Sequence, residues 1–176
     1  RMANVRNLNN LVTASEVVTQ AFTNQATDLA LISDSIIDIA ELAHLKPELG
    51  LDMYEEIKTQ NHNSTLTTAN NTLLTDFIKP ALCWYVRFEV MNEMQYNTTS
   101  AGLVVNVSDF STPVSNEQFN QMKQDTFRKA QVLLDDMVAY IQHEDQTGLY
   151  PLFGHDGDSS MPDTDQATKM NGIIFY

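Results

Sequence analysis

The side chains best suited to catalysis or metal binding are four histidines and a group of aspartates late in the chain. The histidines are scattered without metal-ligand spacing: His44, His62, His143 and His155. Four aspartates between positions 156 and 165 suggest a calcium loop, but the register fails. Position six of that loop would be Met161 rather than glycine, and position twelve would be Ala167 rather than glutamate. A flexible acidic linker is therefore expected, with a weak cation site as the alternative.

The remaining motif searches do not reveal a catalytic constellation. The sequence has no phosphate loop, dinucleotide fingerprint, nucleophile elbow or HExxH motif. His143 precedes two acids at the end of an expected helix, where the helix dipole favours a histidine, so a solvated helix end is preferred to a catalytic dyad. The adjacent acids Glu55 and Glu56 diverge around a helix. We therefore predict a protein that is not an enzyme, with no catalytic residue, no cofactor and no metal.

Composition and charge limit the classes of function further. The 176 residues contain 43% apolar residues, which fits one soluble domain with a real core. A formal charge of −13 argues against sequence-independent binding to nucleic acid and against docking on an anionic membrane. The single cysteine, Cys83, lies on an apolar helical face and is expected to be a buried, inert thiol. We expect no secretory leader and a reducing compartment.

The helix that must organise the rest is predicted over residues 70–98. Apolar residues recur there at steps of three and four, as on one face of a helix: Leu73, Leu74, Phe77, Ile78, Ala81, Leu82, Tyr85 and Phe88. Pro80 lies inside this pattern, so we expect a kink or break near Ile78 and Lys79.

The other elements follow from capping and breaking signals. A capping box at Thr13 and Glu16 predicts a helix over 14–22. A helix over 28–45 should place Asp34, Asp38 and Glu41 mostly toward solvent, and Lys46-Pro47 should end it. A third helix over 51–60, a polar loop over 61–71, and a long helix over 116–144, which begins at a second capping box, complete the helical pattern.

These patterns predict a mainly α fold: a small helical bundle with a short β-strand or hairpin insertion at about 102–113 and an extended C-terminal arm. We assign residues 1–148 to the helical domain and 149–176 to the arm. The arm ends in four large apolar residues after a polar spacer. It either docks on a neighbouring subunit or folds back on its own domain, and both alternatives stay open.

The order of several motifs carries a family resemblance. Residues 45–54 read LKPELGLDMY, residues 74–85 read LTDFIKPALCWY, a valine-rich segment leads to STPVS at 111–115, and YPLF follows the last long helix at 150–153. Together they resemble the head–tail connector (adaptor, or neck-ring) proteins of tailed bacteriophages, particularly those of crAss-like and related phages of Bacteroidetes. The resemblance covers roughly residues 11–153.

The resemblance implies a structural virion protein made in the bacterial host cytoplasm and located in the neck of the virion. Such proteins form a homo-oligomeric ring, commonly of about twelve copies, beneath the portal protein. The ring extends the DNA channel and docks the next neck or tail ring. Genomic DNA would pass through the lumen without specific binding, for which an acidic wall is suited, although the charge fits an outer wall equally. No membrane partner is implied.

The family does not supply functional residues position by position, so the interface candidates are structural expectations. The expected subunit contacts are Val104, Val105, Val107, Phe153, Ile173, Ile174, Phe175 and Tyr176. The loop expected to face the portal or tail contains His62, Ser64, Thr65 and Thr68. The alternative for each of these residues is that it belongs to the ordinary core or to a solvent-exposed loop without a binding role. The alternative function is a monomeric, soluble helical module that binds another protein.

Overall fold

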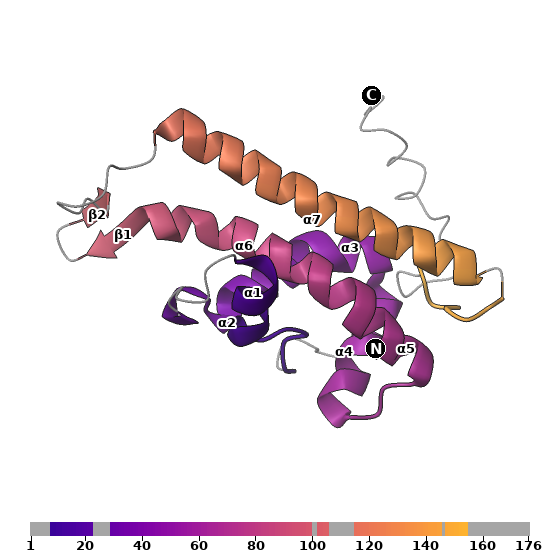
Figure 1. Cartoon of the computed structure of the whole chain (residues 1–176). Coiled ribbons are helices and arrows are strands. Elements are labelled where there is room, and N and C mark those ends of the chain that lie inside the picture. Colours follow the sequence, from indigo (N-terminus) through magenta and orange to yellow (C-terminus); the bar gives the residue numbers. More distant parts are fainter. Residues whose placement is uncertain (1–7, 23–28, 100–101, 106–114, 146, 155–176) are drawn as a thin grey trace, which may run out of the picture.

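The computed structural model describes residues 8–22, 29–99, 102–105, 115–145 and 147–154, and within these ranges the protein is mainly helical. Two long helices, α6 (Lys79–Gln95) and α7 (Asn116–Asp145), lie side by side and form the spine of the fold (Figure 1). In this view α7 lies on one side of α6, and the short helices α1 and α2 lie on the other. The shorter elements before α6 are α1 (Ala14–Ala21), η2 (Leu29–Leu31), α2 (Asp34–Ala40), η3 (Glu41–Leu45), α3 (Lys46–Leu49), α4 (Leu51–Asn63), α5 (Thr68–Thr72) and η4 (Leu73–Ile78).

Both predicted capping boxes are present, and they fix the starts of α1 and α7. The hydroxyl of Thr13 accepts the backbone N–H of Glu16 at 3.3 Å, and the Glu16 carboxylate accepts the backbone N–H of Thr13 at 2.8 Å. Ser115 and Gln118 exchange the equivalent bonds at 3.2 and 3.3 Å. These reciprocal bonds satisfy amide donors that a helix start leaves unpaired, so the predicted starts are confirmed.

The prediction that Lys46-Pro47 ends a helix is wrong. Of the kink or break expected near Ile78 and Lys79, the break is absent, because the helical path continues from η4 through Pro80 into α6. The helical path continues from η3 into α3 as far as Leu49, and Gly50, with φ of 81°, ends it. Each proline lies two residues after a π-helical segment, η3 before Pro47 and η4 before Pro80. In both segments the lysine before the proline donates to a carbonyl five residues back. This shift in hydrogen-bond register accommodates the missing N–H of the proline without breaking the helix.

The predicted helix over 70–98 is too long at its end, because Tyr96–Thr99 form strand β1. This strand pairs antiparallel with β2 (Gly102–Val105), with Tyr96 opposite Val105 and Thr99 opposite Gly102. Tyr and Thr fit the extended backbone better than a helix end, which accounts for the switch. The strand predicted within 102–113 is confirmed for Gly102–Val105, and positions 106–113 lie outside the described residues.

The core lies where α6 meets α1, α2, η4 and α7. The predicted apolar face is buried at six positions, Leu73, Leu74, Ile78, Ala81, Leu82 and Tyr85, whereas Phe77 and Phe88 are partly exposed. The long helix α7 contributes Ala130, Leu134, Met137 and Ile141 to the same core. No helix within the described ranges is both long enough and apolar enough to span a bilayer.

Cys83 is completely buried in this core, as predicted. Burial, with a smaller effect of the Glu16 charge, raises the pKa of its thiol to about 12. Because the thiolate is the reactive form, we expect Ellman's reagent at about pH 8 to label Cys83 slowly in the native protein and rapidly in denaturant. Complete labelling of the native protein at the denatured rate would contradict its placement in the core.

The first part of the predicted arm belongs to the helical domain. Residues 149–154, here called the C-terminal strap, run back over the bundle. Tyr150 is only 3% exposed, and its hydroxyl donates to the carbonyl of Ala69 at 3.0 Å. The N–H of Gly154 donates to the carbonyl of Leu49 at 3.0 Å, and Phe153 is partly buried against the core. The strap therefore follows the fold-back alternative, while 155–176 lie outside the described residues.

Candidate functional site

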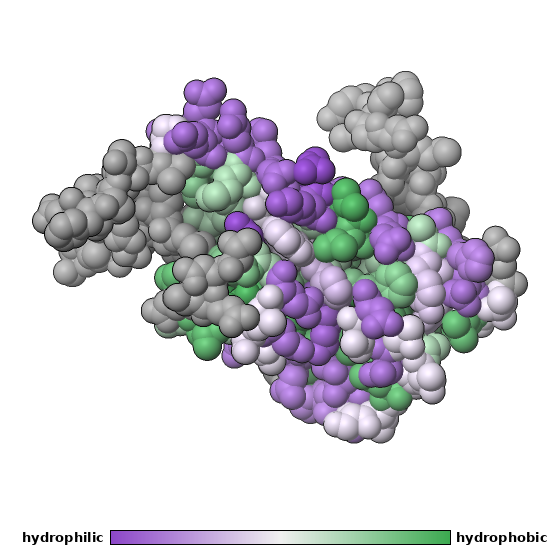
Figure 2. Space-filling view, in the orientation of Figure 1, coloured by the Kyte–Doolittle hydropathy of each residue, from purple (hydrophilic) through white to green (hydrophobic). Residues whose placement is uncertain are grey.

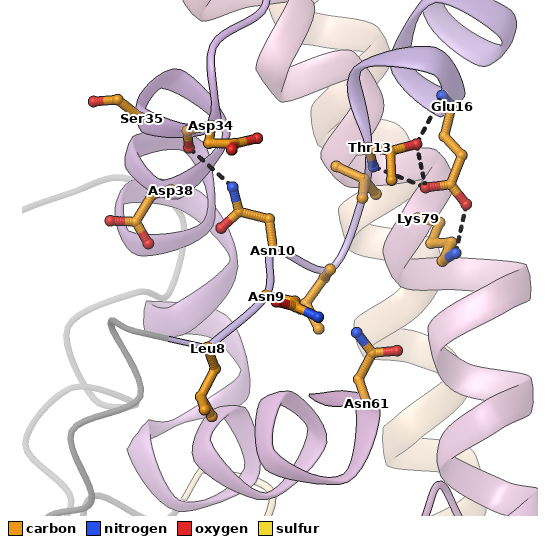
Figure 3. Close-up of a pocket in the computed structure, with 12 residues that line it drawn as sticks. Leu8, Asn9, Asn10, Thr13, Glu16, Asp34, Ser35, Asp38, Asn61 and Lys79 are labelled. Carbon is orange, nitrogen blue, oxygen red and sulfur yellow. Dashed lines mark hydrogen bonds and ion pairs between the residues drawn. The ribbon is translucent and has the colours of Figure 1, made fainter. Parts of the chain in front are cut away.

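One candidate binding feature is a polar cleft of about 830 Å³ between the segment before α1, the helix α2 and the start of α6 (Figure 3). Asn10, Asp34, Ser35 and Asp38 lie on one side of it in this view, and Thr13, Glu16 and Lys79 lie on the other. Its wall is completed by Leu8, Asn9, Leu11, Val12 and Asn61. Amides and carboxylates thus dominate a hollow that the sequence did not predict.

Local hydrogen bonds hold in place the side of the cleft that Asn10 and the start of α2 form. Ser33 caps α2, since its hydroxyl accepts the backbone N–H of Ile36 at 3.4 Å. The side-chain amide of Asn10 donates to the backbone carbonyl of Asp34 at 2.9 Å. The segment before α1 is therefore attached to the first turn of α2, while the carboxylate of Asp34 stays exposed to solvent.

A buried charged cluster lies directly behind the cleft. Glu41 and Lys58 are both 0% exposed, and the Lys58 ammonium donates to Oε2 of Glu41. The same oxygen accepts the hydroxyl of Tyr54 at 3.0 Å, and Oε1 accepts the backbone N–H of Leu11 at 2.7 Å. Lys58 Nζ also lies 3.7 Å from Oδ1 of Asp38. One carboxylate thereby joins the segment before α1, η3 and α4.

The position of Glu41 corrects a prediction. Glu41 was expected to face solvent, but it is buried, whereas the apolar Ile39, two residues before it, is 50% exposed. The buried side of this helix runs through Ile37, Ala40 and Leu45 instead. Isoleucines stand at both 36 and 37, so the apolar pattern did not fix the phase of the helix. Lys58 was also missed, although it follows Tyr54 by four residues and Ile57 by one on a buried face.

The buried cluster changes the pKa of the Tyr54 phenol, which belongs to it. Burial, together with the adjacent Glu41 carboxylate, raises the pKa of Tyr54 well above its ordinary value. The phenol therefore remains protonated and keeps donating to Glu41 through the physiological pH range. All buried side-chain nitrogen and oxygen atoms in the described residues have a hydrogen-bond partner, so the cluster is fully satisfied.

A second ion pair crosses from α1 to α6 at the edge of the cleft. Lys79 Nζ lies 2.5 Å from Oε1 of Glu16, with both side chains partly exposed. Burial acts to raise the pKa of Glu16, but hydrogen bonds from Lys79 and Thr13 and the Lys79 charge outweigh it, so the pKa is lowered. Ionised Glu16 therefore contributes its full stabilisation of the fold above pH 4.5, its ordinary pKa. This contribution is lost as the pH falls through the lower pKa that Glu16 has in the folded protein.

We expect Glu16→Gln to reduce the acid sensitivity of the fold slightly. Gln keeps the capping box but does not titrate, so its stability should fall less between about pH 6 and pH 3. The difference should stay below about 1 kcal/mol because the pair is partly exposed. Urea unfolding at several pH values measures it. Lys79→Met should show the same reduced slope, and an unchanged slope in both variants would contradict the assignment.

The strand β2, which holds Val104 and Val105 of the predicted subunit contacts, lies at the opposite end of the molecule from the predicted loop between α4 and α5 (Figure 1). His62 lies in the last turn of α4 and Thr68 begins α5, so the predicted loop over 61–71 shortens to 64–67. The four loop candidates, His62, Ser64, Thr65 and Thr68, are all exposed. Val104 and Val105 belong to β2 at the far end of α6, whereas Val107 and 173–176 lie outside the described residues. Phe153 lies instead in the C-terminal strap, which is bonded to α5, so the described members of the subunit set are separated from one another.

The boundary between α6 and α7 carries a further feature that the sequence did not predict. Trp84 of α6 has the Arg87 guanidinium 5.2 Å and the Lys129 ammonium 5.1 Å from its ring centre. Arg128 and Lys129 both pair with Asp125. Val132, one turn further along, is 56% exposed. Cationic and apolar groups therefore stand together on a helix of a strongly acidic chain.

The amides, carboxylates and ammonium groups in these arrangements can bind and position a partner surface. Among the described residues no cluster of three His, Cys, Asp or Glu side chains is placed to hold a metal ion. The cleft offers carboxylates and side-chain amides to a cationic or amide-bearing surface. The buried Glu41–Lys58 pair is held away from solvent behind it.

Comparison with known proteins places the chain in a family. A search of curated proteins and a search of solved structures find no match. A family model described as a family of unknown function, DUF6712, matches residues 45–160. The match begins at the last residue of η3 and includes the α3–Gly50–α4 turn, α6, the hairpin, α7 and the C-terminal strap. It covers about two thirds of the sequence, and the chain belongs to the DUF6712 family of unknown function.

Proposed function

We propose that this protein is a head–tail connector subunit of a tailed bacteriophage, assembled in the host cytoplasm and located in the virion neck. Copies form a ring under the portal protein, extend the DNA channel and dock the next neck or tail component. The proposal assigns no enzymatic activity. The observation that carries it is the β1–β2 hairpin, which extends the end of α6 away from the short helices of the bundle (Figure 1).

A hairpin in this position suits a contact between subunits. Its sheet has two strands within the described residues, so both of its edges have backbone groups that the sheet itself does not pair. An isolated two-stranded hairpin is marginally stable in water. A strand or edge from a neighbouring copy would satisfy those groups and stabilise the hairpin. Repeated around an axis, such a head-to-tail contact closes a ring.

The two motifs that carry most of the family resemblance, residues 45–54 and 74–85, contain residues with clear structural roles. In the 45–54 motif, Leu49 and Tyr54 are buried and Gly50 adopts the positive φ that separates α3 from α4. In the 74–85 motif, Pro80 follows the π-helical segment that leads into α6. These motifs therefore determine the geometry of the bundle. They support a scaffold role because they hold no reactive centre.

The test uses the hairpin in the full-length chain. Val104→Pro removes a strand N–H and should yield monomers with an unchanged melting temperature, while Val104→Thr keeps the strand and should assemble as the wild type does. Analytical ultracentrifugation and negative-stain electron microscopy, with and without the portal, measure the assembly. If Val104→Pro forms rings as readily as the wild type, the hairpin is not the contact between subunits. A wild-type chain that stays monomeric and ignores the portal would favour the monomeric protein-binding module.

A further inference from the structure

The β1–β2 hairpin lacks the features that usually protect the edge of a sheet. Natural sheets often shield an open edge with prolines or charged side chains, because unpaired backbone groups there accept another strand. Neither β1 (Tyr96–Thr99) nor β2 (Gly102–Val105) contains a proline or a charged residue. Charge is absent from the whole stretch 94–108, although the chain contains 23 acids and 10 lysines and arginines. The hairpin is therefore suited to take up a further strand.

Of the two strands, β2 is the better acceptor for such an addition. It reads Gly-Leu-Val-Val, whereas β1 reads Tyr-Asn-Thr-Thr. Side chains on neighbouring strands stabilise a sheet as cross-strand pairs, and pairs of β-branched and aromatic residues are among the favourable ones. A segment that pairs with β2 should therefore be uncharged and rich in β-branched or aromatic residues.

The chain itself contains a segment of this kind at 173–176. It reads Ile-Ile-Phe-Tyr, four residues with high β-propensity, and the stretch 170–176 has no charged residue. Where the molecular face in Figure 2 is described, it is mostly hydrophilic, and its hydrophobic side chains lie in separate spots. The edge of β2 suits this segment better than that face does, because a sheet edge binds a strand through the backbone of both partners.

The length of the chain favours a contact between two copies over a contact within one. The C-terminal strap and the hairpin lie at opposite ends of α7, whose 30 residues extend for about 45 Å (Figure 1). The strap is connected to the segment 173–176 by residues 155–172. A coil of that length spans about 25 Å between its ends, and only a nearly extended chain, at about 60 Å, exceeds the length of α7. A neighbour arranged head to tail presents its hairpin at the strap end.

We propose that residues 173–176 of one copy pair with β2 of the next copy as an added strand. This inference rests on the proposed ring and names the segment that joins its subunits. The donor segment follows the strap and the acceptor lies at the other end of α7, so the contact is heterologous, which is the kind that closes a ring. Neither partner carries charge, so the repulsion between acidic copies is weakest where they meet.

The first test changes the added strand in the full-length chain. In an edge strand every second N–H points to its neighbour, so Ile173→Pro with Ile174→Pro removes at least one bonded N–H. This variant should keep the melting temperature of the wild type and lose the rings. Ile173→Val with Ile174→Val is the matched control and should assemble normally. Native mass spectrometry measures the assembly. Rings formed by the proline variant overturn the inference and leave the connector function standing, whereas a wild type that never assembles removes both.

The second test locates the contact with disulfides between separately prepared variants. Val104→Cys is mixed with Ile173→Cys, Ile174→Cys or Phe175→Cys and oxidised, and the native cysteine is buried. At least one mixture should give a covalent dimer with one chain of each variant. Thr65→Cys, in the exposed loop between α4 and α5, is the control and should not link to Val104→Cys. Rings without such dimers overturn the contact. So does a chain carrying both cysteines that links only within itself, because the segment then pairs with its own hairpin.

Discussion

Replacing Lys58 with Met is expected to lower the free energy of unfolding by about 3–5 kcal/mol. Lys58 is completely buried, and its ammonium donates to Glu41, which is also completely buried. Met fills a similar volume, so the loss comes mainly from leaving a buried carboxylate without its cation. Tyr54 and the backbone N–H of Leu11 still donate to that carboxylate, but they carry no charge.

The double variant Glu41→Gln with Lys58→Met separates lost charge from lost packing. A Gln oxygen can still accept the Leu11 N–H, and no buried charge remains, so the double variant should be more stable than Lys58→Met alone. Urea denaturation at neutral pH measures both. A Lys58→Met protein within about 1 kcal/mol of the wild type would contradict the burial and pairing described for this cluster.

Replacing Tyr150 with Ala should have an effect of similar size, about 3–5 kcal/mol. Tyr150 is 3% exposed, its ring meets that of Tyr140 at 6.1 Å between centres, and its hydroxyl donates to Ala69. Removing the ring leaves a cavity under the C-terminal strap and frees the strap from α5. Thermal unfolding gives the overall loss, and hydrogen exchange at Gly154, whose N–H donates to Leu49, reports release of the strap.

Tyr150→Phe is the control for this second expectation. It keeps the ring and removes only the hydroxyl, so it should cost about 1 kcal/mol. Gly154 should remain protected in Tyr150→Phe and lose protection in Tyr150→Ala. Equal protection in the two variants would show that the strap does not depend on the buried ring, and the fold-back of residues 149–154 would need another anchor.

The sequence predicted those parts of the fold whose causes are local. The starts of α1 and α7 came from capping pairs three residues apart, Thr13 with Glu16 and Ser115 with Gln118. The buried face of η4 and α6 came from helical periodicity. The same periodicity predicted that the helix continues past Pro80. The continuation past Pro47 and the two π-helical segments could not be predicted in this way, because a π-helical register shift depends on how the surrounding elements pack.

The cleft and its buried cluster escaped prediction for a related reason. Glu41 and Lys58 lie 17 residues apart on different helices, and the isoleucines at 36 and 37 left the phase of the first helix undetermined. The cleft itself requires Asn10, Asp34 and Lys79 to meet, which only the tertiary fold decides. Of the predicted interface residues, the loop set remains exposed and Phe153 lies partly buried against its own core.

The most direct test of the connector proposal is the native mass of the full-length chain, alone and mixed with the portal protein of the same phage. We expect one discrete species of about twelve copies, formed alone or only on the portal. A chain that remains monomeric in both samples at micromolar concentration would contradict the proposal and leave the monomeric binding module as the better account.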